Sequence, residues 1–270
     1  MKVALIQMNS QADKAANIAQ AEALVAEAAA EGPDLVVLPE YWSALCDRRE
    51  EFHASAEDLS GDRPGGDAYG AMREMARRHR ITLHGGSIVE RAGNAHYNTT
   101  VVFAPDGAEI ARYRKIHLFD VDVPGGVRFR ESETIAPGGE VVTYDCKGHR
   151  VGCAICYDIR FPELFRALRD RGAELIVLPA AFTLMTGKDH WEVLARARAI
   201  ETQTHFLAVG QYGTHAGGRK ACWGHSMVVD PWGHVIAQVG DHVGWTVARI
   251  DHDYTRKVRT ALPVHDHHVM

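Results

Sequence analysis

A segment that occurs twice constrains the fold of this chain more than any other feature. Asp34-Leu-Val-Val-Leu-Pro-Glu40 matches Glu174-Leu-Ile-Val-Leu-Pro-Ala180, and Phe103-Ala-Pro-Asp-Gly107 resembles Val229-Asp-Pro-Trp-Gly233. Both pairs occur in the same order at similar separations. This predicts two related α/β halves, although chance similarity between strand sequences is the alternative. Two sheets packed face to face, with helices outside, would bury both halves. The first copy ends in Glu40 and the second in Ala180, so the acid is not part of the repeated pattern, and its presence in one half must be explained by its local surroundings.

The order of the expected elements indicates an α/β protein with mixed sheets. Hairpins interrupt the alternation of helices and strands, so a purely parallel doubly wound sheet is not expected. The patterns predict helices at 13–31, 66–80, 161–171, 188–202 and 252–260. They predict strands at 2–8, 34–38, 81–91, 96–104, 108–114, 150–156, 173–179, 205–212, 224–230, 234–239 and 244–250. Residues 1–270 contain no break in composition and are expected to form a single domain.

Composition limits the functions that this chain can have. Hydrophobic residues make up 46% of the 270 residues, and the net charge is −5 with neutral histidines. Basic residues occur singly or in short groups, so nucleic acid and anionic membranes are not expected as partners. No apolar run approaches the length of a membrane span, and residues 1–8 resemble a short strand rather than a signal peptide. Five cysteines, an odd number, are typical of reduced thiols in the cytoplasm.

Cys156 is the strongest candidate for a nucleophile. Residues 151–155 are alternately small and apolar, as in a buried strand. The strand must end at the thiol, because Phe161-Pro162-Glu163 opens a helix with proline in its first turn. A cysteine on such a corner is held rigidly near a helix N-terminus. The alternative is a buried structural cysteine, the usual fate of a free thiol.

Three charged residues are candidates to act with Cys156. Glu40 follows an apolar strand, and the C-terminal edge of a strand is where α/β folds place ligands. Lys115 precedes a partly apolar segment; if that segment is buried, the ammonium must find partners. Glu131 lies in an expected loop. Each has a simpler interpretation as an ordinary surface charge.

Three segments together resemble a known family. They are Leu38-Pro39-Glu40-Tyr41-Trp42, Tyr113-Arg114-Lys115-Ile116-His117 and Gly152-Cys153-Ala154-Ile155-Cys156-Tyr157-Asp158. In this order they resemble the nitrilase, or carbon–nitrogen hydrolase, superfamily, and similar segments at 187–192, 196–201 and 224–233 extend the likeness over nearly the whole chain. The resemblance implies a four-layer α-β-β-α sandwich with two mixed sheets, in agreement with the duplicated halves.

The resemblance also implies a role for each candidate residue. Cys156 would be the nucleophile, and Glu40 the general base that takes its proton and later activates water. Lys115 and the backbone N–H of Tyr157 would stabilise the oxyanion, and Glu131 would position Lys115 or the substrate nitrogen. An adjacent base suits a thiol that is mostly protonated near pH 7. The resemblance implies no metal or organic cofactor. It also implies that the protein forms a homodimer or a larger homo-oligomer.

The residues around the nucleophile indicate a branch of the superfamily. Tyr157 follows Cys156, as in amidases, whereas true nitrilases usually have tryptophan there. The segments 156–163 and 190–203 resemble the branch of deaminated-glutathione amidase and ω-amidase, whose substrates are amides of small dicarboxylic acids with a free α-keto acid. Aliphatic amidase, N-carbamoyl hydrolase and nitrilase activities remain alternatives, as does a non-catalytic binding protein that retains the fold.

Two further residues are candidates for substrate binding. Arg160 offers a bidentate partner for a substrate carboxylate, or else forms a structural ion pair with Glu163 or Asp158. Phe182, at the end of a predicted strand, lines the pocket or belongs to the core.

Two motifs that suggest other chemistry are set aside. Cys153 and Cys156 form a Cys-x-x-Cys, but strand alternation places residue 153 on the opposite face from residue 156, and no second pair has metal-ligand spacing. The histidines at 265, 267 and 268 are interpreted as a polar tail.

Overall fold

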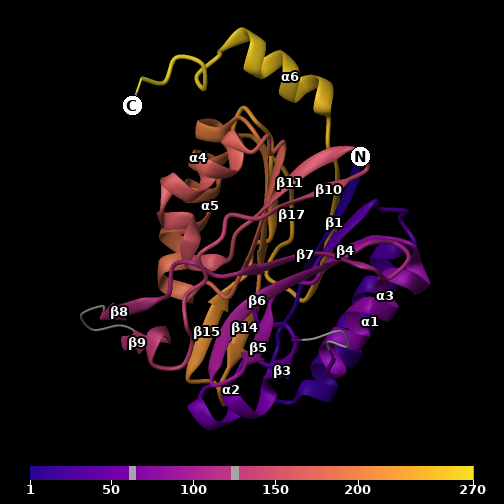
Figure 1. Cartoon of the computed structure of the whole chain (residues 1–270), viewed down its shortest axis with the longest axis vertical. Coiled ribbons are helices and arrows are strands. Elements are labelled where there is room, and N and C mark those ends of the chain that lie inside the picture. Colours follow the sequence, from indigo (N-terminus) through magenta and orange to yellow (C-terminus); the bar gives the residue numbers. More distant parts are fainter. Residues whose placement is uncertain (61–64, 123–127, 270) are drawn as a thin grey trace.

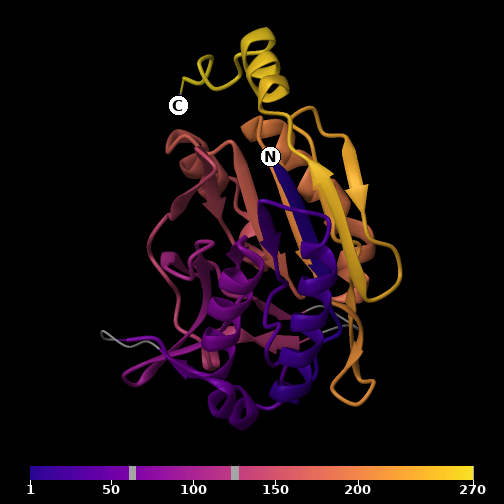
Figure 2. The ribbon, with the colours of Figure 1, turned by 90° about the vertical axis from the view of Figure 1, so that its right-hand side faces the viewer.

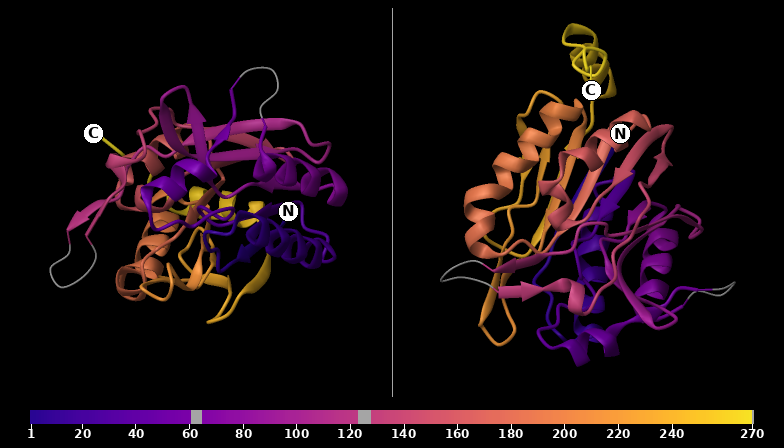
Figure 3. Two further views of the ribbon diagram at one scale, coloured as in Figure 1. Left: turned by 90° about the horizontal axis from the view of Figure 1, so that it is seen from below. Right: turned by 60° about the vertical axis from the view of Figure 1, so that its left-hand side comes forward.

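The computed structural model describes residues 1–60, 65–122 and 128–269. Two β-sheets lie between two pairs of helices, which gives four layers (Figure 1, Figure 3). The outer helices of the first half are α1 (Lys14–Ala29) and α3 (Asp67–His79), and those of the second half are α4 (Pro162–Asp170) and α5 (Leu184–Thr202). The predicted α/β sandwich is confirmed.

The first strand explains why the sheets have helices on one face and another sheet on the other. Val3 and Leu5 pack into a core that continues into the second sheet, whereas Ala4 and Ile6 pack against α1 and α3. All four side chains are fully buried. Because successive side chains of a strand point to opposite faces, a strand that is apolar on both must lie between two packed layers.

The two sheets have the same core topology. The first sheet contains β1 (Lys2–Gln7), β2 (Leu35–Val37), β3 (Glu57–Asp58), β4 (Thr82–His84), β5 (Ile88–Ala92), β6 (Ala95–Phe103), β7 (Glu109–Arg114) and β18 (Gly244–Arg249). The second contains β10 (Thr143–Cys146), β11 (His149–Cys153), β12 (Leu175–Ala180), β13 (His205–Gly210), β16 (Met227–Val229) and β17 (Val235–Gln238). In each, three parallel strands are flanked by antiparallel ones: β18-β1-β2-β4-β6 corresponds to β10-β11-β12-β13-β16.

The duplicated halves predicted from the repeat are therefore confirmed. The repeated apolar segment forms β2 in one sheet and β12 in the other, and the repeated turns join β6 to β7 and β16 to β17. The last strand, β18, returns to the first sheet and pairs antiparallel with β1 over its whole length (Figure 2).

Smaller elements surround the sandwich. They are α2 (Arg49–Ser55), α6 (His252–Ala261), the hairpin of β8 (Asp120–Asp122) and β9 (Arg128–Arg130), the hairpin of β14 (Tyr212–His215) and β15 (Lys220–Trp223), and the 3₁₀ helices η1 (Glu131–Glu133) and η2 (Cys156–Arg160). Helix α6 projects from one end of the molecule (Figure 1). Within the three described ranges, no helix has the length and apolar character needed to cross a membrane.

Several predicted boundaries are wrong for local reasons. The strand expected at 81–91 is broken between β4 and β5, where Gly86 has φ +57° and a Cβ atom would clash with the carbonyl oxygen of Pro39. Helix α5 begins at Leu184, four residues before its expected start. The strand expected at 150–156 ends at Cys153, and the long loop expected before it contains β8, β9, η1 and β10.

Candidate active site

The candidate nucleophile lies on a tight corner between a strand and a helix. Two residues, Ala154 and Ile155, separate the end of β11 from η2, the 3₁₀ helix that precedes α4. Cys156 is the first residue of η2 and has φ +46°. A left-handed backbone is uncommon for a residue with a side chain and is concentrated at functional sites. The thiol is buried, with 8% of the residue exposed. The predicted corner is therefore present, although the strand stops three residues early.

Asp158 holds this corner against the segment that carries Lys115. Its fully buried carboxylate accepts hydrogen bonds from the backbone N–H of Ile155 (2.8 Å) and from the hydroxyl of Tyr113 (2.7 Å). It also accepts the backbone N–H of His117 at 3.0 Å, and His117 Nδ1 lies 2.7 Å away. Tyr113 and His117 flank Lys115 two residues to either side. One carboxylate thus fixes both the nucleophile loop and the lysine segment.

Lys115 lies between two carboxylates. Its Nζ atom is 3.1 Å from Glu40 Oε1 and 2.9 Å from Glu131 Oε2, and all three residues are at least 97% buried. Burial alone would lower the pKa of Lys115, but the charges of Glu131 and Glu40 outweigh burial and raise that pKa well above its usual value. The ammonium therefore stays protonated. The interpretations of these three residues as surface charges are wrong.

The end of the duplicated strand explains why only one copy carries an acid. Glu40 follows β2, and its Oε2 accepts the backbone N–H of Ala181, which directly follows β12, at 2.7 Å. Asn98 Nδ2 donates to the other oxygen of Glu40 at 2.8 Å. The two equivalent strand ends thus meet in one place. One supplies the carboxylate and the other a backbone donor that orients it.

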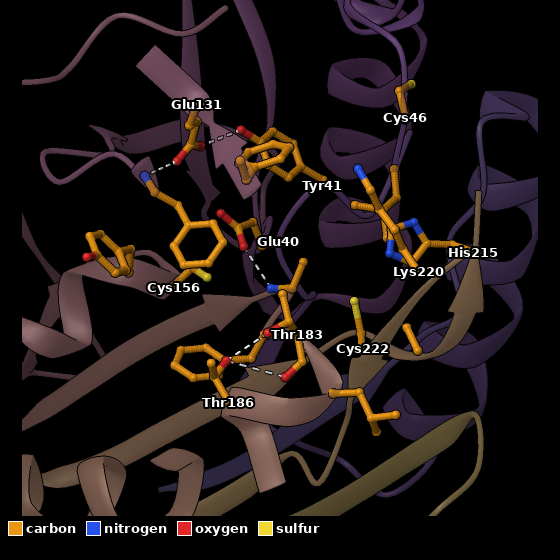
Figure 4. A pocket seen from close by; sticks show the side chains of 18 of the residues that line it. Glu40, Tyr41, Cys46, Glu131, Cys156, Thr183, Thr186, His215, Lys220 and Cys222 are labelled. Carbon is orange, nitrogen blue, oxygen red and sulfur yellow. Dashed lines mark hydrogen bonds between the residues drawn. The ribbon is translucent and has the colours of Figure 1, made fainter. Parts of the chain in front are cut away.

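Glu131 is fixed by three groups besides Lys115. The Tyr41 hydroxyl donates to Oε1 at 2.9 Å, the backbone N–H of Phe119 donates to Oε2 at 2.7 Å, and Asn98 Nδ2 is 3.4 Å from Oε1. Burial, followed by the charges of Glu131 and Glu40, raises the pKa of Tyr41 well above its usual value. Tyr41 therefore remains a hydrogen-bond donor. Figure 4 shows the hydrogen bond between Tyr41 and Glu131.

The surroundings of Cys156 keep its thiol protonated at rest. Burial is the main cause that raises the pKa of Cys156, and the carboxylate of Glu40 raises it further by its charge and as a hydrogen-bond acceptor. Lys115 and the backbone N–H of Ala181 act in the opposite direction. A thiol in this state is a weak nucleophile until a base removes its proton.

Cys156, Glu40, Lys115 and Glu131 line one cavity of about 330 Å³. Much of the remaining wall is formed by the aromatic residues Tyr157, Phe119 and Phe129, the start of α5 and the β14–β15 hairpin. Figure 4 labels Thr186 of α5 and His215, Lys220 and Cys222 of the hairpin. The sequence-predicted residues from three distant segments therefore converge. Asn98 and Asp158 were not predicted as supporting groups, and Tyr41 had no predicted role although it lies within a matching motif.

The two predicted binding residues differ in position. Phe182 lines the cavity and also packs on Trp191, with ring centroids 5.1 Å apart, so both interpretations of it hold. Arg160 is not among the described lining residues. Its guanidinium lies over the rings of Tyr157 (5.8 Å) and Phe182 (5.4 Å), and Nη2 is 3.3 Å from His190 Nδ1. It thus contacts two residues that line the cavity.

Groups that could hold a metal lie away from this cavity. In the described ranges, His149, Glu174 and His252 form the single cluster with ligand atoms close enough for one ion, and none of them lines the cavity. Cys153 is fully buried among core residues and does not line it either. The charged groups that act on the thiol of Cys156 include Glu40 and Lys115.

A thiol beside a fixed acid and a fixed ammonium is an arrangement suited to nucleophilic catalysis with stabilisation of an oxyanion. The family model described as "Carbon-nitrogen hydrolase" matches residues 2–260, and this chain belongs to that family.

Relatives and solved structures agree with this assignment. The chain is 40% identical over 263 residues to "Omega-amidase NIT2" of Homo sapiens, covering 97% of this chain and 93% of the relative. It is 39% identical over 273 residues to "Deaminated glutathione amidase" of Synechocystis, covering 98% of this chain and 97% of the relative. Nit3 of Saccharomyces cerevisiae, a member of branch 10 of the nitrilase superfamily, has a TM-score of 0.88 at 33% identity, with 98% of this chain and 94% of that chain covered. The C. elegans NitFhit protein has a TM-score of 0.90 at 37% identity; 99% of this chain but only 64% of that longer chain is covered.

Proposed function

We propose that this carbon–nitrogen hydrolase is an amidase that cleaves a small linear carboxamide through a thioester on Cys156. The observation that carries the proposal is the position of Lys115, held between Glu40 and Glu131 in the cavity that contains the thiol. Full-length relatives named as amidases support the reaction class.

The residues suggest a division of labour in the first half of the reaction. Glu40 takes the proton of Cys156, and the thiolate attacks the amide carbon. The resulting oxyanion is stabilised by the ammonium of Lys115 and by the backbone N–H of Tyr157; such fixed donors act strongly in a site that excludes water. Glu40 then returns its proton to the leaving nitrogen, the C–N bond breaks, and ammonia or an amine departs.

The second half reverses the roles. Glu40 accepts a proton from water, the hydroxide adds to the thioester carbon, and the same donors stabilise the second oxyanion. Collapse breaks the C–S bond, releases the carboxylic acid and returns the proton to the thiol. Glu131 keeps Lys115 in place through both halves.

The substrate is proposed to be an ω-amide of an α-keto dicarboxylic acid, or a larger amide of the deaminated-glutathione type. The names of the two sets of relatives support these classes equally. Arg160 is proposed to attract the carboxylate of the acyl group through the wall formed by Tyr157 and Phe182. Nitrile, N-carbamoyl and simple aliphatic amide substrates are the alternatives.

Release of ammonia or amine from a panel of amides and one nitrile tests this function. The wild-type protein should hydrolyse α-keto amides with the highest kcat/KM, and Cys156→Ala should abolish release. Cys153→Ala is the matched control, since it removes the neighbouring thiol of the Cys-x-x-Cys and should retain activity. Activity in Cys156→Ala, or no activity in the wild type, would contradict the proposal and would favour a non-catalytic binding protein.

We further propose a cytoplasmic homodimer or larger homo-oligomer that needs no cofactor. The resemblance to the superfamily supports the assembly, and the five free cysteines support a reducing compartment. Size-exclusion chromatography with light scattering tests the assembly.

A further inference from the structure

The end of the cavity formed by the β14–β15 hairpin carries polar groups that the proposed reaction does not use. His215 and Lys220 are directly opposite each other in this hairpin, and both line the cavity. In Figure 4 they lie on the side of the cavity away from Cys156. The cavity therefore has a second polar end.

His215 has a hydrogen-bonding atom without a partner. The residue is only 8% exposed, and its Nδ1 atom is buried with no hydrogen bond to any part of the chain that the structure describes. Burial, and then the charge of Lys220, lowers the pKa of His215, so the ring is neutral and can donate one N–H. Buried polar atoms without partners are uncommon in proteins, and a bound water, ion or ligand is one explanation for them.

Lys220 belongs to a cluster with more positive than negative charge. Its Nζ is 2.6 Å from Asp47, and Arg219 Nη2 is also 2.6 Å from that same carboxylate. Hydrogen bonds from Lys220 and Arg219 lower the pKa of Asp47 to about 2, so the acid is ionised, but it balances only one of two cations. An ammonium has three donors, and Lys220 can hold a second carboxylate while it keeps Asp47.

The excess of positive charge continues in a depression that adjoins the cavity. A neighbouring depression shares Lys220, Phe52 and Phe129 with the cavity. Its charged wall residues are four cations, Arg49, Arg128, Arg130 and Lys220, and two acids, Asp47 and Glu133. This local excess contrasts with the net charge of −5 for the whole chain. Positive charge at the mouth of a cleft attracts anionic substrates.

We propose that Lys220 and His215 bind a carboxylate on the leaving amine of the substrate, so that the enzyme favours amides that release an amino acid or peptide over amides that release ammonia. The inference rests on the proposed function, in which the acyl group is bound near Arg160, Tyr157 and Phe182. In this arrangement the acyl group is proposed to lie on the Tyr157 side of Cys156, and the leaving amine on the side of His215 and Lys220.

Three substrates with one α-keto acyl group test this inference: the primary amide, the amide of glycine, and the amide of glycinamide. Only the second carries a carboxylate on its leaving amine. Lys220→Met should lower kcat/KM for the glycine amide about tenfold or more, mainly through KM, as expected for loss of a charge-assisted contact. The other two substrates should change by less than about twofold. Lys220→Arg should restore most of the loss, and Lys188→Met, at an exposed site on α5, is the matched control.

The outcomes separate the two proposals. Equal losses on all three substrates, or no loss on the glycine amide, would overturn the hairpin subsite and leave the amidase proposal intact. A wild-type protein that releases neither ammonia nor amine from any of the three would overturn the proposed function, and the subsite with it.

Discussion

Replacement of Lys115 by methionine separates catalysis from stability in this site. Methionine has a similar length but removes the ammonium that lies 3.1 Å from Glu40 and 2.9 Å from Glu131. Loss of one fixed oxyanion donor costs roughly 10²–10³ in kcat in comparable sites. Lys115→Met should therefore show at least this loss, measured as amine release.

The same variant should also unfold at a lower temperature. Removal of one partner of a buried ion pair costs about 3–5 kcal/mol, because the remaining charge is left uncompensated. At about 2–4 °C per kcal/mol for a chain of this size, Tm should fall by roughly 10 °C. The reason is specific: two buried carboxylates, Glu40 and Glu131, would face each other with no cation between them.

The double variant Lys115→Met with Glu131→Gln distinguishes the two effects. The single oxygen of glutamine can still accept one of the hydrogen bonds that Tyr41 and the backbone N–H of Phe119 donate to the two oxygens of Glu131, and the substitution removes one of the two charges. Thermal unfolding should recover by several degrees in the double variant, while activity should stay absent. Recovery of activity, or an unchanged Tm in Lys115→Met alone, would refute the assigned role of the lysine.

Three other changes have expected outcomes. Glu40→Gln should abolish turnover. Because the carboxylate of Glu40 raises the pKa of Cys156, iodoacetamide should alkylate this thiol at a lower pH in the variant than in the wild type. An unchanged pH profile of alkylation would mean that Glu40 does not act on the thiol. Asp158→Asn leaves a buried amide that cannot accept all four hydrogen bonds of the carboxylate. The variant should therefore have a kcat at least tenfold lower and a lower Tm. A kcat equal to that of the wild type would mean that Asp158 does not position the turn that carries Cys156. Arg160→Ala should raise KM for carboxylate-bearing amides more than for neutral ones, and equal effects on both would exclude it from substrate binding.

The two related halves could be predicted from the sequence because the repeated segments form equivalent strands and turns in the two sheets. The matching segments fall on β2 and β12 at equivalent places in the two sheets, and the unbroken apolar run of β1 is typical of a strand with both faces buried. Boundaries fail where tertiary contacts decide them. Gly86 interrupts a predicted strand because the chain passes close to Pro39, which lies far from it in sequence.

The three central site residues could be predicted because each belongs to a compact motif. Their supporting groups could not, because the contacts join distant segments. Asp158 binds Tyr113, which is 45 residues away, and Asn98 reaches Glu40 across 58 residues. The β14–β15 hairpin was also missed, although Gly217-Gly218 offered a turn signal between its strands.

Mass spectrometry of the protein quenched during turnover tests the central claim most directly. We predict a mass increase equal to the acyl group of the substrate on the peptide that contains Cys156, removed by hydroxylamine and missing in Cys156→Ala. An active enzyme without any such adduct, or with the adduct on Cys46, Cys153 or Cys222 instead, would contradict the proposed thioester and the role of the acid and the ammonium around it.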